Sequence, residues 1–355
     1  MIQPTVTVCI PTYNRRHLLS SSLRSVLEQD FEDVEIIVLD NASTDGTADF
    51  VASIDDPRLR YEPTTENIGL FGNLTRALRL GSGKYRVMLP DDDLMLPGNL
   101  RAKVTFLEAN PSAGMVHSAF RYLGDDARPY GGTRSWARLD SDTLEPGVSF
   151  LRRSIAIGGI VCVSSVMLRS AVVEGERFSA EDGPYCDLAL WLRVASRSDV
   201  GFLAAPLSGY LVHQSSASSG FNIVRIRGQR HQMTSHHADA ILQAHGRFVQ
   251  RADLSDHLRQ ELGAILVDAD RRMRMTIRAN ALFSPGTLGV LKKAAHWQPG
   301  NLLHRLMAVG SSARVLTAED AASGVAARPV PASPQSTISV DTTARPAAVP
   351  SAADA

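Results

Sequence analysis

Apolar and polar residues alternate in blocks along the first 110 positions. Short, mostly apolar runs predict buried strands at residues 6–10, 34–40, 59–61 and 85–89. Between them, apolar residues recur at the spacing of an amphipathic helix, at residues 17–29, 47–54, 70–80 and 100–109. Apolar strands that alternate with helices favour an α/β fold in which a Rossmann-like, mainly parallel central sheet carries helices on both faces.

The pattern changes after residue 110. Strands are predicted at 114–123, at 161–169 and, as one or two short pieces, within 200–214, with a helix at 186–196. From residue 223 the spacing is helical, and from about residue 318 Ala, Pro, Ser and Thr replace the large apolar residues. We therefore predict a domain over 1–222 with halves at 1–110 and 111–222, a C-terminal helical appendage over 223–315 and a disordered tail over 316–355.

Composition sets limits on the kind of protein. The formal net charge is zero, so the chain as a whole gives no argument for nucleic-acid binding. Three cysteines form no motif, and Cys9 and Cys162 lie in apolar runs, as expected of buried thiols in a reducing compartment. The chain start does not resemble a signal peptide, and no apolar run reaches the roughly 18 to 20 residues of a membrane span. We expect a cytoplasmic protein.

Basic residues outnumber acidic ones in the predicted C-terminal helices, notably at 271–278 and 292–297. Such helices could lie on an anionic surface, which would place the protein peripherally at the inner face of the cell membrane. The alternative is an ordinary solvated helical bundle.

The stretch VMLPDDDLMLP places three carboxylates, Asp91 to Asp93, directly after an apolar strand. Charges of one sign at 4 Å repel by roughly 1 kcal/mol in water and about 4 kcal/mol at an effective dielectric of 20. Polar residues also follow the strands at 6–10 and 34–40, and the carboxyl ends of parallel strands meet at one edge of a sheet. Clustered aspartates there suit Mg²⁺ or Mn²⁺ bound together with a diphosphate. The structural alternative is that they cap the next helix.

Five segments occur in an order typical of one enzyme family. They are VTVCIPTYNR, VEIIVLDNASTDGT, NIGLFGNLTRALRLGSGKYRVMLPDDDLMLP, CDLALWLRVA and GYLVHQSSAS, and they run from residue 6 to about residue 219. Together they resemble the inverting nucleotide-sugar glycosyltransferases of family 2, which have the GT-A fold. The resemblance implies that residues 1–110 bind the nucleotide sugar and that residues 111–222 carry the acceptor and catalytic groups.

The resemblance also implies which residues hold the donor. Asp40 could accept a hydrogen bond from the base, and Thr12, Tyr13 and Asn14 could contact base and ribose. Helix N-termini offer free backbone N–H groups to an anion, which would suit the segment around Asn67. The implied nucleotide-sugar contacts are Pro11, Thr12, Tyr13, Asn14, Asp40, Asn67, Gly69, Asn73, Asp91 and Asp92. Loop packing and helix capping are the structural alternatives for these residues.

The cofactor implied by the resemblance is Mn²⁺ or Mg²⁺. Family members use two aspartates separated by one residue, here Asp91 and Asp93, and we expect Asp93 to be the direct metal ligand. Many relatives carry another aspartate where this chain has Pro90, so Asp92 could share this role. His213 would complete the metal shell or hold the diphosphate, although a histidine after a strand is more often structural.

An inverting transfer needs a base that takes the proton of the attacking acceptor hydroxyl. The resemblance assigns this role to Asp187, at the start of the helix 186–196, where the helix dipole should lower its pKa. Glu181 and Asp182 are the alternative bases, because relatives usually carry two acidic residues where this chain has Cys186 and Asp187. The structural alternative for Asp187 is a helix cap.

These expectations describe a metal-dependent inverting glycosyltransferase with a nucleoside-diphosphate sugar as donor and a glycan or lipid-linked acceptor. The first strand lacks the nucleophilic aspartate of haloacid-dehalogenase-like phosphotransferases, and no G-x-G-x-x-G follows it, as a nicotinamide dehydrogenase would require. A catalytically inactive relative that binds a nucleotide sugar or a partner remains the non-enzymatic alternative.

Overall fold

The computed structural model describes residues 3–124, 129, 133, 139–158, 161–211, 213, 235–251, 253–282 and 328–329. Every strand and helix predicted within the first 110 residues is present. These elements are β1 (Val6–Thr12), α1 (Arg16–Leu27), β2 (Val34–Asp40), α2 (Thr47–Ala52), β3 (Leu59–Pro63), α3 (Gly69–Arg79), β4 (Tyr85–Met88) and α4 (Asn99–Ala109). The sequence did not predict β5 (Leu94–Met95), which directly follows the three aspartates.

Beyond residue 110 the prediction is less accurate. The elements are β6 (Ala113–Leu123), β7 (Thr143–Glu145), α5 (Gly147–Ile157), β8 (Val166–Arg169), α6 (Cys186–Ala195), β9 (Asp199–Leu211), α7 (Ser235–Val249), α8 (Asp256–Leu282) and β10 (Arg328–Pro329). The strand predicted at 161–169 is wrong in its first half, because Val163–Ser165 forms a 3₁₀ turn before β8. The segment 200–214 contains one long strand, β9, instead of short pieces.

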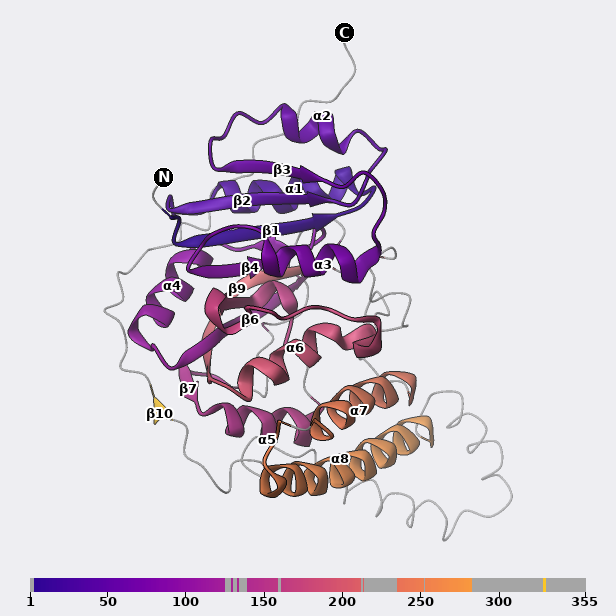
Figure 1. The fold of residues 1–355 in the computed structure, drawn as a ribbon. Coiled ribbons are helices and arrows are strands. Elements are labelled where there is room, and N and C mark those ends of the chain that lie inside the picture. Colours follow the sequence, from indigo (N-terminus) through magenta and orange to yellow (C-terminus); the bar gives the residue numbers. More distant parts are fainter. Residues whose placement is uncertain are drawn as a thin grey trace.

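The described strands form one sheet in the order β10-β7-β9-β6-β8-β4-β1-β2-β3, with β5 paired to β9 (Figure 1). Neighbours among β3, β2, β1 and β4 are all parallel, and β6 is parallel to β9. β8 runs antiparallel between β4 and β6, and β5 and β7 run antiparallel to β9. The parallel sheet predicted from the sequence is therefore the part formed by β1 to β4, and the rest is mixed.

Alternation along the strands produces one apolar core on each face of the sheet. In β1, Val8 and Ile10 point into a core that contains Leu23 of α1 and Leu100 of α4. Cys9, between them, points into the second core. That second core contains side chains from α3, α5, α6, α7 and α8. The prediction of helices on both faces is confirmed.

The described part of the C-terminal helical region packs directly on the domain (Figure 1). Ile241 of α7 and Leu262 of α8 are buried in the same core as α5 and α6. Arg152 of α5 forms an ion pair with Glu261 of α8, with 2.6 Å between Nε and Oε1. Within the described residues no helix is both long and apolar enough to span a membrane.

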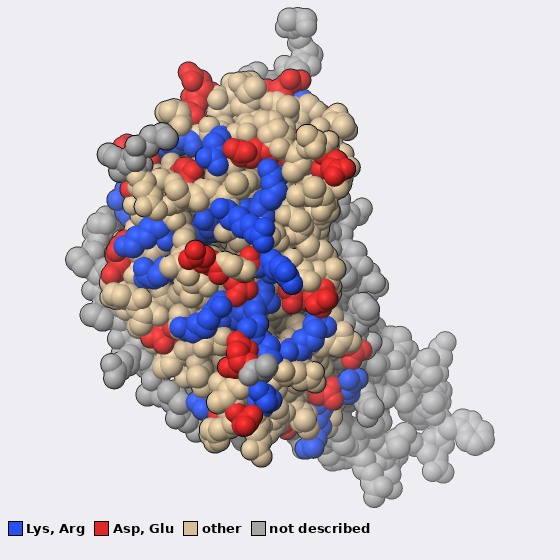
Figure 2. Space-filling view, in the orientation of Figure 1, with Lys and Arg blue, Asp and Glu red and all other residues tan. Residues whose placement is uncertain are grey.

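Basic side chains gather in a band on one face of the molecule, with acidic side chains between them (Figure 2). Several charged side chains of the protein form close ion pairs, for example Glu176 with Arg193 at 2.7 Å and with Arg197 at 2.6 Å. The short strand β10 lies within the tail predicted to be disordered and pairs with β7. The other residues of 316–355 lie outside the described residues.

Candidate active site

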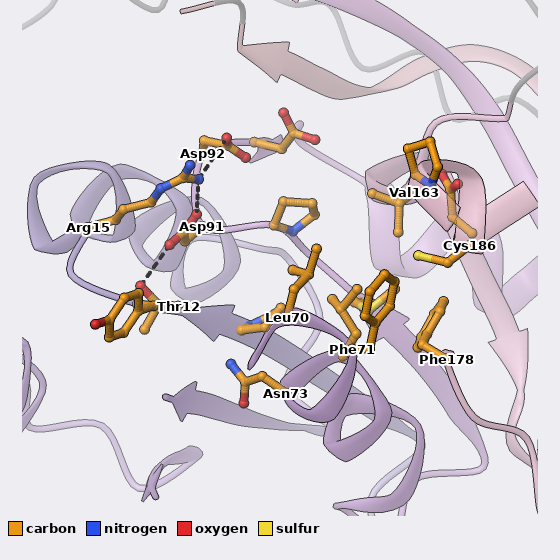
Figure 3. Close-up of a pocket in the computed structure, with 18 of the residues that line it drawn as sticks. Thr12, Arg15, Leu70, Phe71, Asn73, Asp91, Asp92, Val163, Phe178 and Cys186 are labelled. Carbon is orange, nitrogen blue, oxygen red and sulfur yellow. Dashed lines mark hydrogen bonds and ion pairs between the residues drawn. The ribbon is translucent and has the colours of Figure 1, made fainter. Parts of the chain in front are cut away.

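A cavity of about 850 Å³ opens at the carboxyl ends of β1 and β4, where the predicted strand ends meet. The starts of α3 and α6 and the ends of β6 and β9 complete its wall. Figure 3 shows Thr12, Arg15, Asp91 and Asp92 at one end and apolar side chains such as Phe71 and Phe178 at the other. Of the predicted residues, those that line the cavity are Pro11, Thr12, Tyr13, Asn67, Gly69, Asn73, Asp91, Asp92, Asp93 and Asp187.

Asp91 and Asp92 form the polar end together with groups from two other segments. Thr12 Oγ1 donates to Asp91 Oδ2 at 2.7 Å. Arg15 Nη1 lies 3.2 Å from Asp91 Oδ1 and 3.3 Å from Asp92 Oδ2 (Figure 3). His213 Nε2, from the segment after β9, lies 3.0 Å from the same Asp92 oxygen. The repulsion between the adjacent carboxylates is therefore offset by the guanidinium and by hydrogen bonds.

Asp93 has a different environment from its two neighbours. It is 2% exposed, and the backbone N–H of Leu211 donates to its Oδ1 at 3.0 Å, which links the aspartates to the end of β9. Burial, reinforced by the charge of Asp92, raises the pKa of Asp93 well above its ordinary value. Burial and the charge of Asp92 also raise the pKa of Asp91, to about 6, although Thr12 and Arg15 act in the opposite direction.

These side chains fit a hard divalent cation that brings phosphate ligands with it. Asp91 Oδ1 and Asp92 Oδ2 converge on one positive group, the guanidinium of Arg15, which marks a point where a cation is stabilised. Across the described residues, no three His, Cys, Asp or Glu side chains converge closely enough to hold a metal ion alone. Mg²⁺ is typically held by one or two carboxylates together with substrate phosphates, so a complete protein cage is not required.

Asp40 and Asn14 lie beside the cavity and outside its described lining. Ser43 Oγ donates to Asp40 Oδ1 at 2.5 Å, and the Tyr61 hydroxyl donates to Asp40 Oδ2. Asp40 is 1% exposed, so both of its oxygens are engaged inside the protein. Asn14 Oδ1 accepts the backbone N–H of Thr44 at 2.7 Å and joins the first two loops. In this structure both residues shape the loops next to the cavity.

Asn41, the residue after Asp40, lines the cavity, whereas Asp40 does not. Asn41 Nδ2 donates to Asn67 Oδ1 at 2.9 Å, and Asn41 Oδ1 accepts the backbone N–H of Ile68 at 2.9 Å. The backbone N–H of Gly69, which has a φ of 76°, donates to Asn67 Oδ1 at 2.8 Å. The start of α3 is thus bound to the end of β2. Among the predicted donor contacts, Asn67 and Gly69 are brought to the cavity by this network.

Asp187 lies at the apolar end, at the start of α6. The lining around it includes Tyr185, Cys186 and Phe178. The backbone N–H of Leu188 donates to Asp187 Oδ1 at 2.8 Å. Burial raises the pKa of Asp187 to about 6, which outweighs the lowering effect of the backbone N–H groups. The backbone groups at the helix start act in the expected direction, but burial makes the net shift of the Asp187 pKa upward.

The two alternative bases are placed differently. Asp182 Oδ1 lies 3.5 Å from Arg193 Nη1, and its backbone oxygen accepts a hydrogen bond from Arg247 at 2.8 Å. Neither Glu181 nor Asp182 belongs to the described lining of the cavity, whereas Asp187 does. The geometry favours Asp187 among the three acidic residues.

Several lining residues were not singled out from the sequence. Arg15 is the last residue of the segment VTVCIPTYNR, but nothing in that segment shows that its side chain reaches Asp91. Phe120, Tyr122 and Tyr210 form a cluster with ring centres 5.3 to 6.2 Å apart, which depends on the pairing of β6 with β9. Their even spacing, at 120 and 122 within one strand, is the one sequence signal that predicts a shared face.

Comparisons with known proteins give the family. Residues 7–170 match the model of Glycosyl transferase family 2. The chain is 40% identical over 101 residues to a GalNAc(5)-diNAcBac-PP-undecaprenol β-1,3-glucosyltransferase of Campylobacter jejuni, which covers 27% of this chain and 32% of that protein. The family 2 glycosyltransferase sequence that the motifs indicate is therefore confirmed over residues 7–170.

Two solved structures share the fold. S. aureus TarS 1–349 in complex with UDP-GlcNAc aligns with a TM-score of 0.57 and 16% identity, over 75% of this chain and 72% of that one. The mannosyltransferase PcManGT from Pyrobaculum calidifontis, in complex with GDP-Man and Mn²⁺, aligns with a TM-score of 0.53 and 20% identity, over 92% and 89%. The fold is GT-A. The chain spans between 32% and 66% of the length of four curated relatives that it matches.

Proposed function

We propose that this protein is a metal-dependent inverting glycosyltransferase that moves a sugar from a nucleoside diphosphate to an acceptor hydroxyl. The observation that carries the proposal is one cavity with two kinds of carboxylate. At its polar end Asp91 and Asp92 converge on a positive group, and at its apolar end Asp187 lies alone among aromatic and thiol side chains. A transferase of this class needs both: a place for a charged leaving group and a base for the acceptor.

The polar end would hold the diphosphate and its cation. Asp91 and Asp92 would bind Mn²⁺ or Mg²⁺, with His213 beside Asp92, and the ion when bound would neutralise the charge that develops on the departing diphosphate. The resemblance identifies Asp93 as the direct metal ligand. Asp93 would take part in binding the ion while the backbone N–H of Leu211 holds its carboxylate in place. The Mn²⁺ in PcManGT is consistent with this cofactor.

Asp187 would act as the base. It would take the proton of the acceptor hydroxyl while that oxygen forms a bond to the anomeric carbon. The bond from this carbon to the phosphate oxygen would break, and its electron pair would stay on the nucleoside diphosphate. Attack from the side opposite to the leaving group inverts the anomeric centre. A pKa of about 6 leaves Asp187 ionised at neutral pH but basic enough to accept the proton.

The donor nucleotide would lie along the first loops and the start of α3. Thr12, Tyr13, Asn67, Gly69 and Asn73 line this part of the cavity. Asn14 and Asp40 would support the nucleotide through the loops that they brace. Both structural relatives were solved with a nucleotide sugar, UDP-GlcNAc in one and GDP-Man in the other. The acceptor would be a glycan or a lipid-linked glycan, in keeping with the undecaprenol-linked substrate in the name of the Campylobacter relative.

A lipid-linked acceptor would require contact with a membrane surface, and we propose a cytoplasmic protein that works peripherally at the inner face. Val267 and Met275 on α8 are 63% and 57% exposed. Arg271 lies between them at the spacing of one helix face. Exposed apolar residues interleaved with a basic one are typical of a helix that contacts anionic lipid.

The proposal is tested by titrating the protein with UDP, GDP and dTDP by calorimetry, with and without Mn²⁺. We expect metal-dependent binding of one nucleotide, and loss of that binding in Asp92→Ala. Transfer is then assayed with the matching nucleotide sugar and isolated lipid-linked glycan acceptors. Folded protein that binds none of the three nucleotides under any metal condition would contradict the proposal. Binding without transfer to any acceptor would favour the inactive binding module.

A further inference from the structure

The guanidinium of Arg15 occupies the point at which the two metal-binding carboxylates meet. Arg15 Nη1 lies 3.2 Å from Asp91 Oδ1 and 3.3 Å from Asp92 Oδ2 (Figure 3). A divalent cation bound to the same two oxygens would need the space that this nitrogen fills. Two positive groups there would also repel each other strongly, because the side chains of Asp91 and Asp92 are only 6% and 12% exposed.

The first loop directs Arg15 into the cavity. Asn14 has a φ of 52° and is held by Ser43 and Thr44 of the next loop, so the chain turns sharply just before α1. The next residue, Arg16, points elsewhere: its guanidinium lies 5.9 Å from the centre of the Phe50 ring. One basic side chain of the pair therefore serves the aspartates and the other does not.

We propose that Arg15 is a positioning residue that holds the Asp91–Asp92 pair when the cation is absent and turns to the diphosphate of the donor when the cation binds. The inference rests on the proposed function. The Arg15 side chain is 28% exposed and lines the cavity, so its guanidinium can move toward a ligand. A guanidinium forms paired hydrogen bonds with phosphate oxygens as readily as with carboxylates. Arg15 thus makes binding of the cation and of the nucleotide mutually dependent.

The test is Mn²⁺ binding without nucleotide, followed by the electron paramagnetic resonance signal of free Mn²⁺, in wild type and in Arg15→Gln. We expect the variant to bind Mn²⁺ roughly tenfold more tightly, because a competing positive charge is removed from both carboxylates. In the presence of Mn²⁺, the same variant should bind the nucleoside diphosphate roughly tenfold or more weakly, because a charged phosphate contact is lost. Arg16→Gln is the matched control and should leave both affinities unchanged.

Arg15→Lys adds a second check, since it keeps the positive charge but loses the planar guanidinium that forms paired hydrogen bonds. It should bind Mn²⁺ alone about as weakly as wild type. Unchanged or weaker Mn²⁺ binding by folded Arg15→Gln would overturn the inference while leaving the transferase proposal intact. Failure of wild type to bind any nucleotide with Mn²⁺ would instead contradict the proposed function.

Discussion

The two ends of the cavity contain the same type of side chain in opposite surroundings. At the polar end, Asp91 and Asp92 share Arg15, and Asp92 also contacts His213. At the apolar end, Asp187 lies among aromatic and thiol side chains and accepts a backbone N–H of its own helix. The pKa values of Asp91 and Asp187 are both raised to about 6 by burial, but neighbouring charges contribute at Asp91, whereas backbone groups alone oppose burial at Asp187.

This difference would allow one cavity to carry out the two proposed tasks, cation binding and proton acceptance, at separate places. Under the proposed function, the crowded carboxylates with nearby positive charge would form a site that exchanges one cation for another. A single desolvated carboxylate forms a site that exchanges a proton, since burial favours its neutral form. The two ends of the cavity differ in the groups that surround the aspartates, because the residue type is the same at both ends.

The largest effect should come from Asp187→Asn, which keeps the shape of the side chain and removes its basicity. We expect transfer to fall by roughly 10² to 10⁴, the usual contribution of a general base, with nucleotide affinity changed less than about twofold. Steady-state assays and calorimetry on the same sample measure both. If Asp182→Asn abolishes transfer and Asp187→Asn does not, the assignment of the base is wrong.

At the polar end, Asp92→Asn should weaken Mn²⁺-dependent nucleotide binding by roughly a hundredfold, because one of two converging carboxylates loses its charge. Calorimetry with and without Mn²⁺ separates this loss from a general defect in nucleotide binding. Asp256→Asn, whose side chain is 98% exposed on α8, is the matched control and should bind normally. Equal affinities for wild type and Asp92→Asn would remove Asp92 from the cation site.

The pH dependence of transfer and of stability tests the carboxylates at both ends of the cavity. The base must be ionised, so transfer should rise by about tenfold per pH unit below pH 6 and become level above it. Stability should follow the opposite sign. A raised pKa means that the folded protein holds protons which the unfolded chain has released, so these carboxyls contribute less stability as the pH rises from about 4 to 6.

Thermal unfolding across this pH range tests the stability statement, and Asp187→Asn should make the curve shallower, because the contribution of Asp91 remains. A rate profile that is level down to pH 4 would show that the proton acceptor is a group with an ordinary pKa.

The smallest effect concerns Lys103 of α4, a buried group outside the cavity lining. It is 0% exposed, and its Nζ has no hydrogen-bond partner among the described residues. Burial lowers its pKa to about 7, whereas in the unfolded chain it titrates near 10. The unfolded chain therefore binds more protons between these values, and stability should rise with pH from about 7 to 10.

Lys103→Met should remove this slope and stabilise the protein at neutral pH by roughly 1 to 3 kcal/mol, because a partnerless buried amine is replaced by an apolar side chain of similar length. Denaturant unfolding at pH 7 and pH 9.5 measures both effects. A variant that is less stable than wild type at both values would show that Lys103 has a partner in solution.

Apart from β5, the order of strands and helices up to residue 110 follows from the sequence, because each apolar run has one period and ends at Gly, Pro or a polar turn. The same pattern, with the shared edge of a parallel sheet, predicts that Thr12 and Asp91 lie together. In the structure, Thr12 Oγ1 lies 2.7 Å from Asp91 Oδ2. Family motifs led to Asp187, which lines the same cavity. The period is weaker after residue 110, and there the sequence wrongly predicts a strand over the 3₁₀ turn at Val163–Ser165.

The sequence by itself thus determined the alternating core, the family and the residues gathered at the sheet edge, since these depend on local spacing and motif. Tertiary structure alone decided that Arg15 bridges Asp91 and Asp92, that Asn41 faces the cavity while Asp40 is engaged by Ser43 and Tyr61, and that burial raises the pKa of Asp187. The physical reason is that hydrogen-bond partners and loss of solvent are set by segments far apart in the chain. The spacing of residues along the sequence does not specify those contacts.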